Sequence, residues 1–98
     1  MSLAYRITVI RESWQQEYSN TVRSLNRTRS FLINNDFNRC RQELLTGRES
    51  SRRMSDYSDI YPVPTDRDIR FKTKMSLSCA LLSQEAEGLL LKTVIIII

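Results

Sequence analysis

The amino-acid sequence predicts a mainly α-helical protein, with two long amphipathic helices that a flexible linker joins into a helical hairpin or a coiled-coil bundle. Two observations lead to this fold class. Apolar residues recur every three or four positions over two long stretches, which is the spacing of one helix face. The 98 residues also contain only two glycines and two prolines, and an all-β sandwich or barrel needs many more turn-forming residues.

The first segment, from about residue 4 to residue 32, has one narrow apolar stripe. Its members are spaced as on one helix face, and they are Ile10, Trp14, Tyr18, Val22, Leu25 and Leu32. Polar residues fill the other positions, so the pattern predicts an amphipathic helix. Thr21 and Thr28 lie at the edge of the stripe and make it imperfect. The opening AYRITVI alternates apolar and polar residues, which leaves a short strand as an alternative.

The sequence INNDF at residues 33–37 interrupts this stripe. Three of its side chains can accept the hydrogen bond that starts a helix, and they are Asn34, Asn35 and Asp36. The next stretch has an apolar face of Phe37, Cys40 and Leu44, and Gly47 is expected to end it. One continuous helix is an alternative, but three consecutive polar residues favour a break and a hairpin.

Residues 48–65 have no apolar periodicity and are rich in serine, arginine and aspartate. They end in YPVP, and its two prolines hold the backbone extended. We therefore interpret 48–65 as a flexible linker between an N-terminal basic helical segment, 1–47, and a C-terminal segment, 66–98.

Within this predicted linker, RRMS places Arg52 and Arg53 before Ser55. Protein kinases that prefer basic substrates read this arrangement, so Ser55 is a candidate phosphorylation site. A phosphate there would add roughly −1.5 to −2 charges. The alternative is a plain solvated tether.

The C-terminal segment predicts a second long helix from Asp66 to about Thr93, with Thr65 or Asp66 as its cap. Its apolar residues alternate at spacings of four and three, as in a coiled-coil seam, and they are Met75, Cys79, Leu82, Ala86 and Leu89. Further apolar residues widen this face, so we expect it to be contacted on more than one side. The tail VIIII is β-branched, which favours a strand or a covered position.

The composition argues against an enzyme or a metalloprotein. The chain has no histidine, the commonest side chain for proton transfer near neutral pH. Cys40 and Cys79 each stand alone, so we interpret them as buried helix residues in a cytoplasmic or other reducing compartment, with a disulfide between them as the alternative. We expect no catalytic residues, cofactor or metal. The N-terminal stretch lacks the apolar core of a signal peptide, and charges interrupt the C-terminal apolar run before it is long enough to span a membrane.

Positive charge is concentrated in the first half of the chain. Residues 1–53 contain ten arginines and five acidic residues, whereas residues 54–98 contain five basic and six acidic ones. Arg23, Arg27 and Arg29 lie near one flank of the first helix and are expected to steer acidic partners. The same flank makes a nucleic-acid-binding module the alternative function, and attachment to a membrane surface is less favoured.

These patterns predict a non-enzymatic helical interaction or structural protein that binds itself or another protein through coiled-coil-like faces, with a homo-oligomer expected. The predicted partner-binding residues are Trp14, Tyr18, Val22, Leu25, Leu32, Met75, Cys79, Leu82, Ala86 and Leu89. The fragments ESWQQEYSNTV, LLTGRESSRR and LLSQEAEGLLLKT resemble pieces of tektins, the coiled-coil filament proteins of cilia. They cover about a third of the chain, and tektins are several times longer. The resemblance implies a filament-associated form of the interaction protein.

Overall fold

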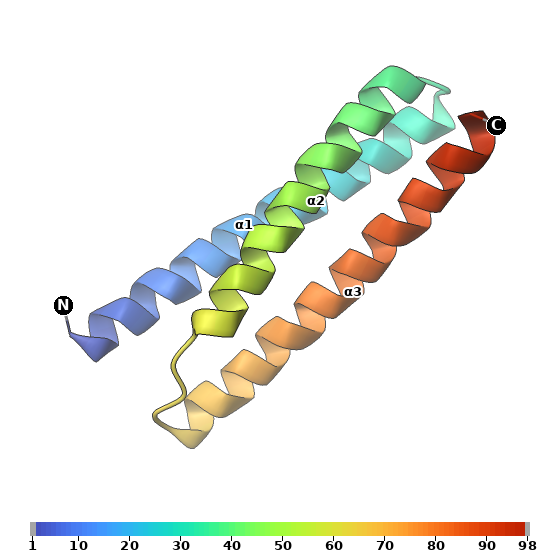
Figure 1. Cartoon of the computed structure of the whole chain (residues 1–98). Helices are drawn as coiled ribbons and strands as arrows, with labels where there is room; N and C mark the ends of the chain where they lie inside the picture. The colour runs from blue at the N-terminus through green and yellow to red at the C-terminus, as the bar shows by residue number, and fades with distance from the viewer. Residues whose placement is uncertain (1, 98) are drawn as a thin grey trace.

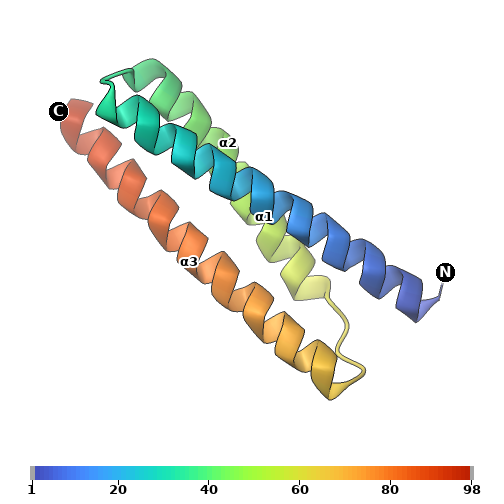
Figure 2. The ribbon, with the colours of Figure 1, turned by 180° about the vertical axis from the view of Figure 1, so that it is seen from behind.

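The chain folds into three antiparallel helices that form an elongated bundle of 50 × 19 × 15 Å. The computed structural model describes residues 2–97, with side chains for residues 2–94, and its helices are α1 (Leu3–Ile33), α2 (Phe37–Ile60) and α3 (Asp66–Ile97). Figure 1 and the reverse view in Figure 2 show α3 lying along the α1–α2 hairpin. The mainly α-helical prediction is confirmed, with three helices in place of two. The strand alternative for AYRITVI is wrong, because α1 begins at Leu3.

The predicted break after the first helix is confirmed. Helix α1 ends at Ile33, and Asn35 takes the left-handed backbone conformation, with φ 58°. Asp36 starts α2, because its carboxylate accepts a hydrogen bond from the Arg39 amide at 3.4 Å. Left-handed backbone suits asparagine better than most residues, so this tight turn reverses the chain and brings α2 back along α1.

The interpretation of 48–65 as a flexible linker is wrong for its first thirteen positions, since α2 continues to Ile60. The buried residues of α2 are Cys40, Leu44, Gly47, Ser50, Ser51, Met54 and Ser58. All of them except Ser50 follow spacings of four and three, and the buried Tyr61 continues this pattern just beyond the helix. Glycine and serine occupy positions of this seam that are usually apolar, so a count of apolar residues misses it. Only residues 61–65 connect α2 to α3, where Pro62 disfavours a helical conformation at Tyr61.

Gly47 does not end a helix as expected but allows α1 and α2 to approach closely. A Cβ atom at Gly47 would lie 3.2 Å from the Ser24 Cβ. Thr21 and Thr28, which the sequence places at the edge of the stripe, are fully buried in α1. Their hydroxyls donate to the carbonyl oxygens of Glu17 and Ser24, at 2.7 and 2.8 Å. These internal hydrogen bonds satisfy the two hydroxyls, so the threonines can fill the interior next to apolar side chains.

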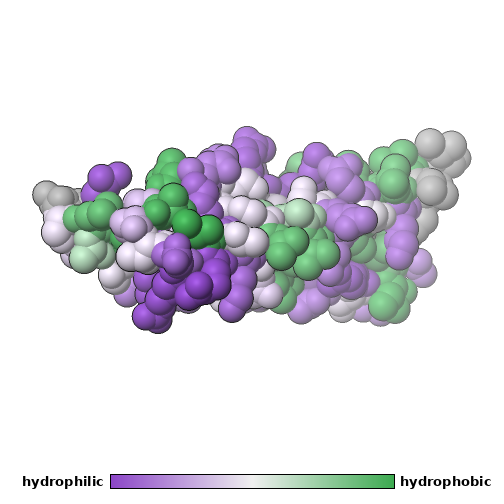
Figure 3. Space-filling view, turned by 90° about the horizontal axis from the view of Figure 1, so that it is seen from below, coloured by the Kyte–Doolittle hydropathy of each residue, from purple (hydrophilic) through white to green (hydrophobic). Residues whose placement is uncertain are grey.

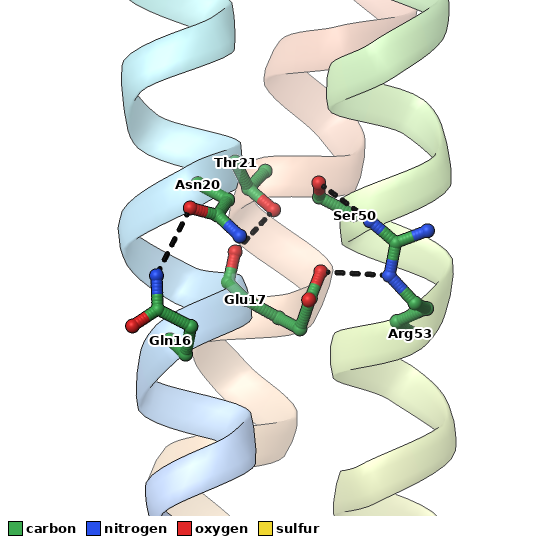
Figure 4. A network of polar contacts seen from close by, with 6 residues as sticks. All are labelled: Gln16, Glu17, Asn20, Thr21, Ser50 and Arg53. Carbon is green, nitrogen blue, oxygen red and sulfur yellow. Dashed lines mark hydrogen bonds and ion pairs between the residues drawn. The ribbon is translucent and has the colours of Figure 1, made fainter.

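A polar network joins the middle of α1 to α2, as Figure 4 shows. The Arg53 Nε donates to the Glu17 carboxylate at 2.9 Å, and its second nitrogen donates to the Ser50 hydroxyl at 3.2 Å. The Glu17 side chain is only 15% exposed. Glu17 therefore occupies a nearly buried position between two helices, and Arg53 compensates its charge.

Helix α3 covers the hairpin with the seam that the sequence predicts. Met75, Cys79, Leu82, Ala86 and Leu89 are all buried. Thr65 caps the helix, because its hydroxyl accepts from the Asp68 amide at 3.2 Å and donates to the Asp68 carboxylate at 2.6 Å. The helix continues through Ile97, so a strand, one of the alternatives for the tail, is wrong as far as the described residues reach.

The two cysteines are free and buried, as small helix residues would be. The Cys40 sulfur lies 3.8 Å from the Thr93 hydroxyl, whereas Cys79 is fourteen residues earlier in α3. Fourteen residues of helix span about 21 Å, far more than a disulfide can bridge. The alternative of a disulfide between them is therefore wrong.

Aromatic residues attach the start of α3 to α1. The Phe71 ring lies 6.5 Å from Trp14 and 5.4 Å from Tyr61, and the Arg11 guanidinium lies 5.2 Å from its centre. The buried Tyr61 donates its hydroxyl to Asp68 at 3.0 Å. The hydrogen bond from Thr65 is the largest effect and lowers the pKa of Asp68; desolvation, the next largest, opposes it, and the smaller effects of Tyr61 and Arg11 lower the pKa further.

Candidate protein-interaction surfaces

The residues predicted to bind a partner lie mostly inside the chain's own bundle. Seven of the ten are buried there, and they are Trp14, Leu25, Met75, Cys79, Leu82, Ala86 and Leu89. Val22 and Leu32 are half-buried against the same core. Tyr18 is exposed and stacks on Trp14 at 5.4 Å. The two predicted faces are therefore covered within the chain, mainly by the buried residues of α2, and a partner would meet other residues.

The three arginines predicted to steer acidic partners do not form one cluster. Arg27 pairs with Glu43 of α2 at 3.5 Å, and Arg29 pairs with Glu85 of α3 at 2.9 Å. Arg23 is exposed and has no ion pair within the part of the chain that the structure describes. Two of the three arginines thus form ion pairs with different helices of the bundle, on different sides of α1.

Ser55 lies in the second half of α2, five residues before its end, where it is half-buried. The predicted flexible surrounding, on which its recognition by a kinase depends, is wrong. The regular helix means that Ser55 could enter a kinase cleft only if this part of α2 unfolded. Its role as a phosphorylation site stays a prediction.

A groove runs between α2 and α3, and the sequence did not reveal it. Its first part is a hollow of about 430 Å³ whose walls include Ser51, Ser55 and Ser83. A second hollow of about 280 Å³ shares Ser55 and Ser83 with the first. It shares Ser76 and Ala80 with a third hollow of about 590 Å³ at the start of α3. The three hollows adjoin one another along α3, the first two with walls from α2 as well, and we call them together the α2–α3 groove.

The α2–α3 groove has small side chains along its middle and apolar ones at its ends. Leu45 stands at one end and is exposed, whereas Val63 and Ile69 line the other end. Arg48 and Glu87 form an ion pair of 3.5 Å between the two walls near the Leu45 end. No group of three metal-binding side chains occurs among the described residues. Serines at seam and flanking positions of α2 are the signal that could have indicated this groove.

A second apolar stripe lies on the side of α3 that points away from the core, which we call the outer face of α3. Its apolar members are Ile69, Leu77, Ala80, Leu81, Leu91 and Val94. Leu77, Leu81 and Leu91 are 60%, 60% and 62% exposed. In Figure 3, seen from below, apolar side chains reach the surface in several patches among hydrophilic ones. The widened apolar face of this helix is thus contacted on only one side within the chain.

Comparison with known proteins leaves the fold and these surfaces as the basis for any functional conclusion. No family model, curated protein or solved structure matches this chain. None of the helices within residues 2–97 combines the length and the hydropathy required to cross a bilayer.

Proposed function

We propose that this chain is a non-enzymatic helical interaction protein of the structural or scaffold kind. It would receive a helix of a protein partner, or of a second copy of itself, in the α2–α3 groove. The resemblance of its sequence to tektin fragments favours a filament-associated setting for this assembly.

The continuity of the groove is the observation that supports this proposal most strongly. An open channel between two parallel walls of helix is the surface that an additional helix fills in a four-helix bundle. Small residues such as Ser55, Ser83 and Ala80 permit a close approach of helix backbones. Leu45 at one end and Val63 at the other offer apolar contacts. A partner helix with apolar ends and a small, polar middle would match this pattern.

Blocking the groove tests the proposal. Ser55→Arg/Ser83→Arg places long side chains at the two serines that adjoining hollows share. The matched control is Ser19→Arg/Ser30→Arg, which adds the same side chains at exposed positions of α1. We expect the wild-type chain and the control to self-associate in analytical ultracentrifugation, and the groove variant to sediment as a monomer with unchanged circular dichroism.

Two results would count against this proposal. A groove variant that assembles as well as the control would show that the α2–α3 groove is not the contact. A monomeric wild-type chain over the whole accessible concentration range would exclude self-assembly and restrict the proposal to a different protein as partner.

Nucleic-acid binding through Arg23, Arg27 and Arg29 is the alternative function. It has weaker support, because Arg27 and Arg29 are engaged in ion pairs on different sides of the bundle. If it operates, changing all three arginines to alanine should abolish binding to a DNA or RNA oligonucleotide, and affinity should fall steeply with salt. The groove variant should then bind like the wild type.

A further inference from the structure

The outer face of α3 combines exposed leucines with considerable length. Leu77 and Leu91 lie fourteen residues apart, about 21 Å along the helix, and each is at least 60% exposed. Leu77 and Leu81 form one apolar group and Leu91 another, with Gln84 and Gly88 between them. Exposed apolar groups of this kind on a small protein indicate contact with another surface. The stripe lies on the solvent-facing side of α3, opposite the buried residues Met75 and Leu82.

Cations follow one edge of this stripe. At 100° per residue, Arg70, Lys74 and Lys92 project within about 60° of the direction of Leu77. None of the three has an ion pair with an acidic side chain in the described part of the chain. Their charges are therefore available to an external partner.

The acidic residues of α3 do little to cancel this charge. Glu85 is paired with Arg29 of α1 at 2.9 Å, and Glu87 is paired with Arg48 of α2 at 3.5 Å. The other two acids, Asp66 and Asp68, are in the first turn of the helix. Cations without an ion pair thus stand at both ends of the stripe, Arg70 and Lys74 before Leu77 and Lys92 after Leu91, and the two glutamates between these ends are paired with arginines of the other helices.

Exposed leucines beside cations without ion pairs indicate what kind of partner covers the outer face of α3. A second copy would bring two rows of like cations together, which is unfavourable. A nucleic acid would match the cations but leave the leucines uncovered, and a partner helix prefers a groove with two walls. An anionic lipid surface satisfies both features, because its acyl boundary takes apolar side chains and its headgroups attract lysine and arginine.

We propose that the outer face of α3 lies on an anionic lipid surface. Leu77, Leu81 and Leu91 enter the boundary between headgroups and acyl chains, while Lys74 and Lys92 reach the headgroups. Long basic side chains can bury their aliphatic stems and keep their charges at the interface. The bundle axis then lies parallel to the membrane. The outer face shares Leu77 with the hollow at the start of α3, whereas Leu81 and Leu91 lie outside the α2–α3 groove, so this proposal is tested apart from the groove at those two leucines.

Flotation with lipid vesicles tests the role of charge. The full chain is mixed with phosphatidylcholine vesicles, with or without phosphatidylserine. One basic residue near an anionic surface changes the partition coefficient by roughly fivefold. We therefore expect Lys74→Glu/Lys92→Glu to weaken binding to the phosphatidylserine vesicles by at least about 25-fold. Arg6→Glu/Arg23→Glu makes the same change of net charge at exposed positions of α1 and should weaken it much less.

A second pair of variants tests the apolar contact. Leu81→Gln/Leu91→Gln should lose most of the binding, whereas Leu3→Gln/Ile33→Gln, at exposed positions of α1, should retain it. Circular dichroism checks that each variant keeps its helices. The proposal fails if vesicles without phosphatidylserine bind equally well, if the chain binds neither kind of vesicle, or if both members of a pair lose binding equally. It also fails if Leu81→Gln/Leu91→Gln instead dissociates a dimer in sedimentation, since the stripe would then belong to a second copy.

Discussion

The two glycines of this chain lie inside helices, yet the same substitution should affect them in opposite ways. At Gly88 a new Cβ would meet no atom within 4 Å. Gly88→Ala therefore gains only the better helix propensity of alanine, and we expect it to stabilise the fold by about 0.5–1 kcal/mol. For a domain of this size, each 1 kcal/mol corresponds to a rise of roughly 4–8 °C in Tm.

At Gly47 the same gain meets a steric cost. The new Cβ would lie 3.2 Å from the Ser24 Cβ and 3.4 Å from a Leu25 methyl, and both side chains are buried in α1. Overpacking of a tight interface costs about 1–3 kcal/mol. We therefore expect Gly47→Ala to destabilise the fold by roughly 1 kcal/mol after the gain in helix propensity is subtracted.

Thermal and urea unfolding, both monitored by circular dichroism, measure the stability of each variant relative to the wild type. Ser24→Gly removes the atom that the new methyl would approach, so a double-mutant cycle of Gly47→Ala with Ser24→Gly should show a favourable coupling energy. If Gly47→Ala raised Tm as much as Gly88→Ala, the close approach of α1 and α2 at this level would be wrong.

Three further predictions concern charge and burial. Arg53→Met leaves the nearly buried Glu17 carboxylate unpaired and should cost about 1–2 kcal/mol in urea unfolding, less than a fully buried pair because Arg53 is half exposed. The lowered pKa of Asp68 adds stability above its unfolded pKa that is lost as pH falls through the folded value, so the Tm of Asp68→Asn should decline less on acidification. Leu82→Asp puts a charge in the core and should abolish the helical signal, whereas Leu81→Asp, at an exposed position, should keep it.

The sequence was sufficient for the helical class, the turn at residues 33–36 and the inner seam of α3. In each case the signal was a large apolar residue at helical spacing or a group of capping residues. Met75, Leu82 and Leu89 are buried as their spacing indicates. Large apolar side chains dominate the free energy of burial, so their positions can be recognised without knowledge of the partner surface.

The second helix was missed beyond Gly47 for a physical reason. Ser51 and Ser58 are polar by composition but small in volume, and the seam at this level needs small volume. The Ser58 hydroxyl is satisfied by Ser76 of α3 at 3.1 Å, which removes the usual cost of burying it. A serine in a heptad position can thus indicate a close helix contact, but only when another helix is already known to lie against it.

The same error explains why the predicted partner-binding surface differs from the surfaces that the bundle leaves open. With residues 48–60 treated as a linker, the stripes around Trp14 and Leu82 had no intramolecular cover and required a second molecule. Once α2 is included, those stripes are covered, and the exposed apolar residues are instead Leu45 at the groove and Leu77 on the outer face of α3. The additional helical residues 48–60 change which side chains can contact a partner. The argument that exposed apolar stripes need to be covered still holds, but it now applies to other residues. Tests of function should therefore change Ser83 or Leu77, because changes in the inner seams would be expected to unfold the bundle before they revealed anything about binding.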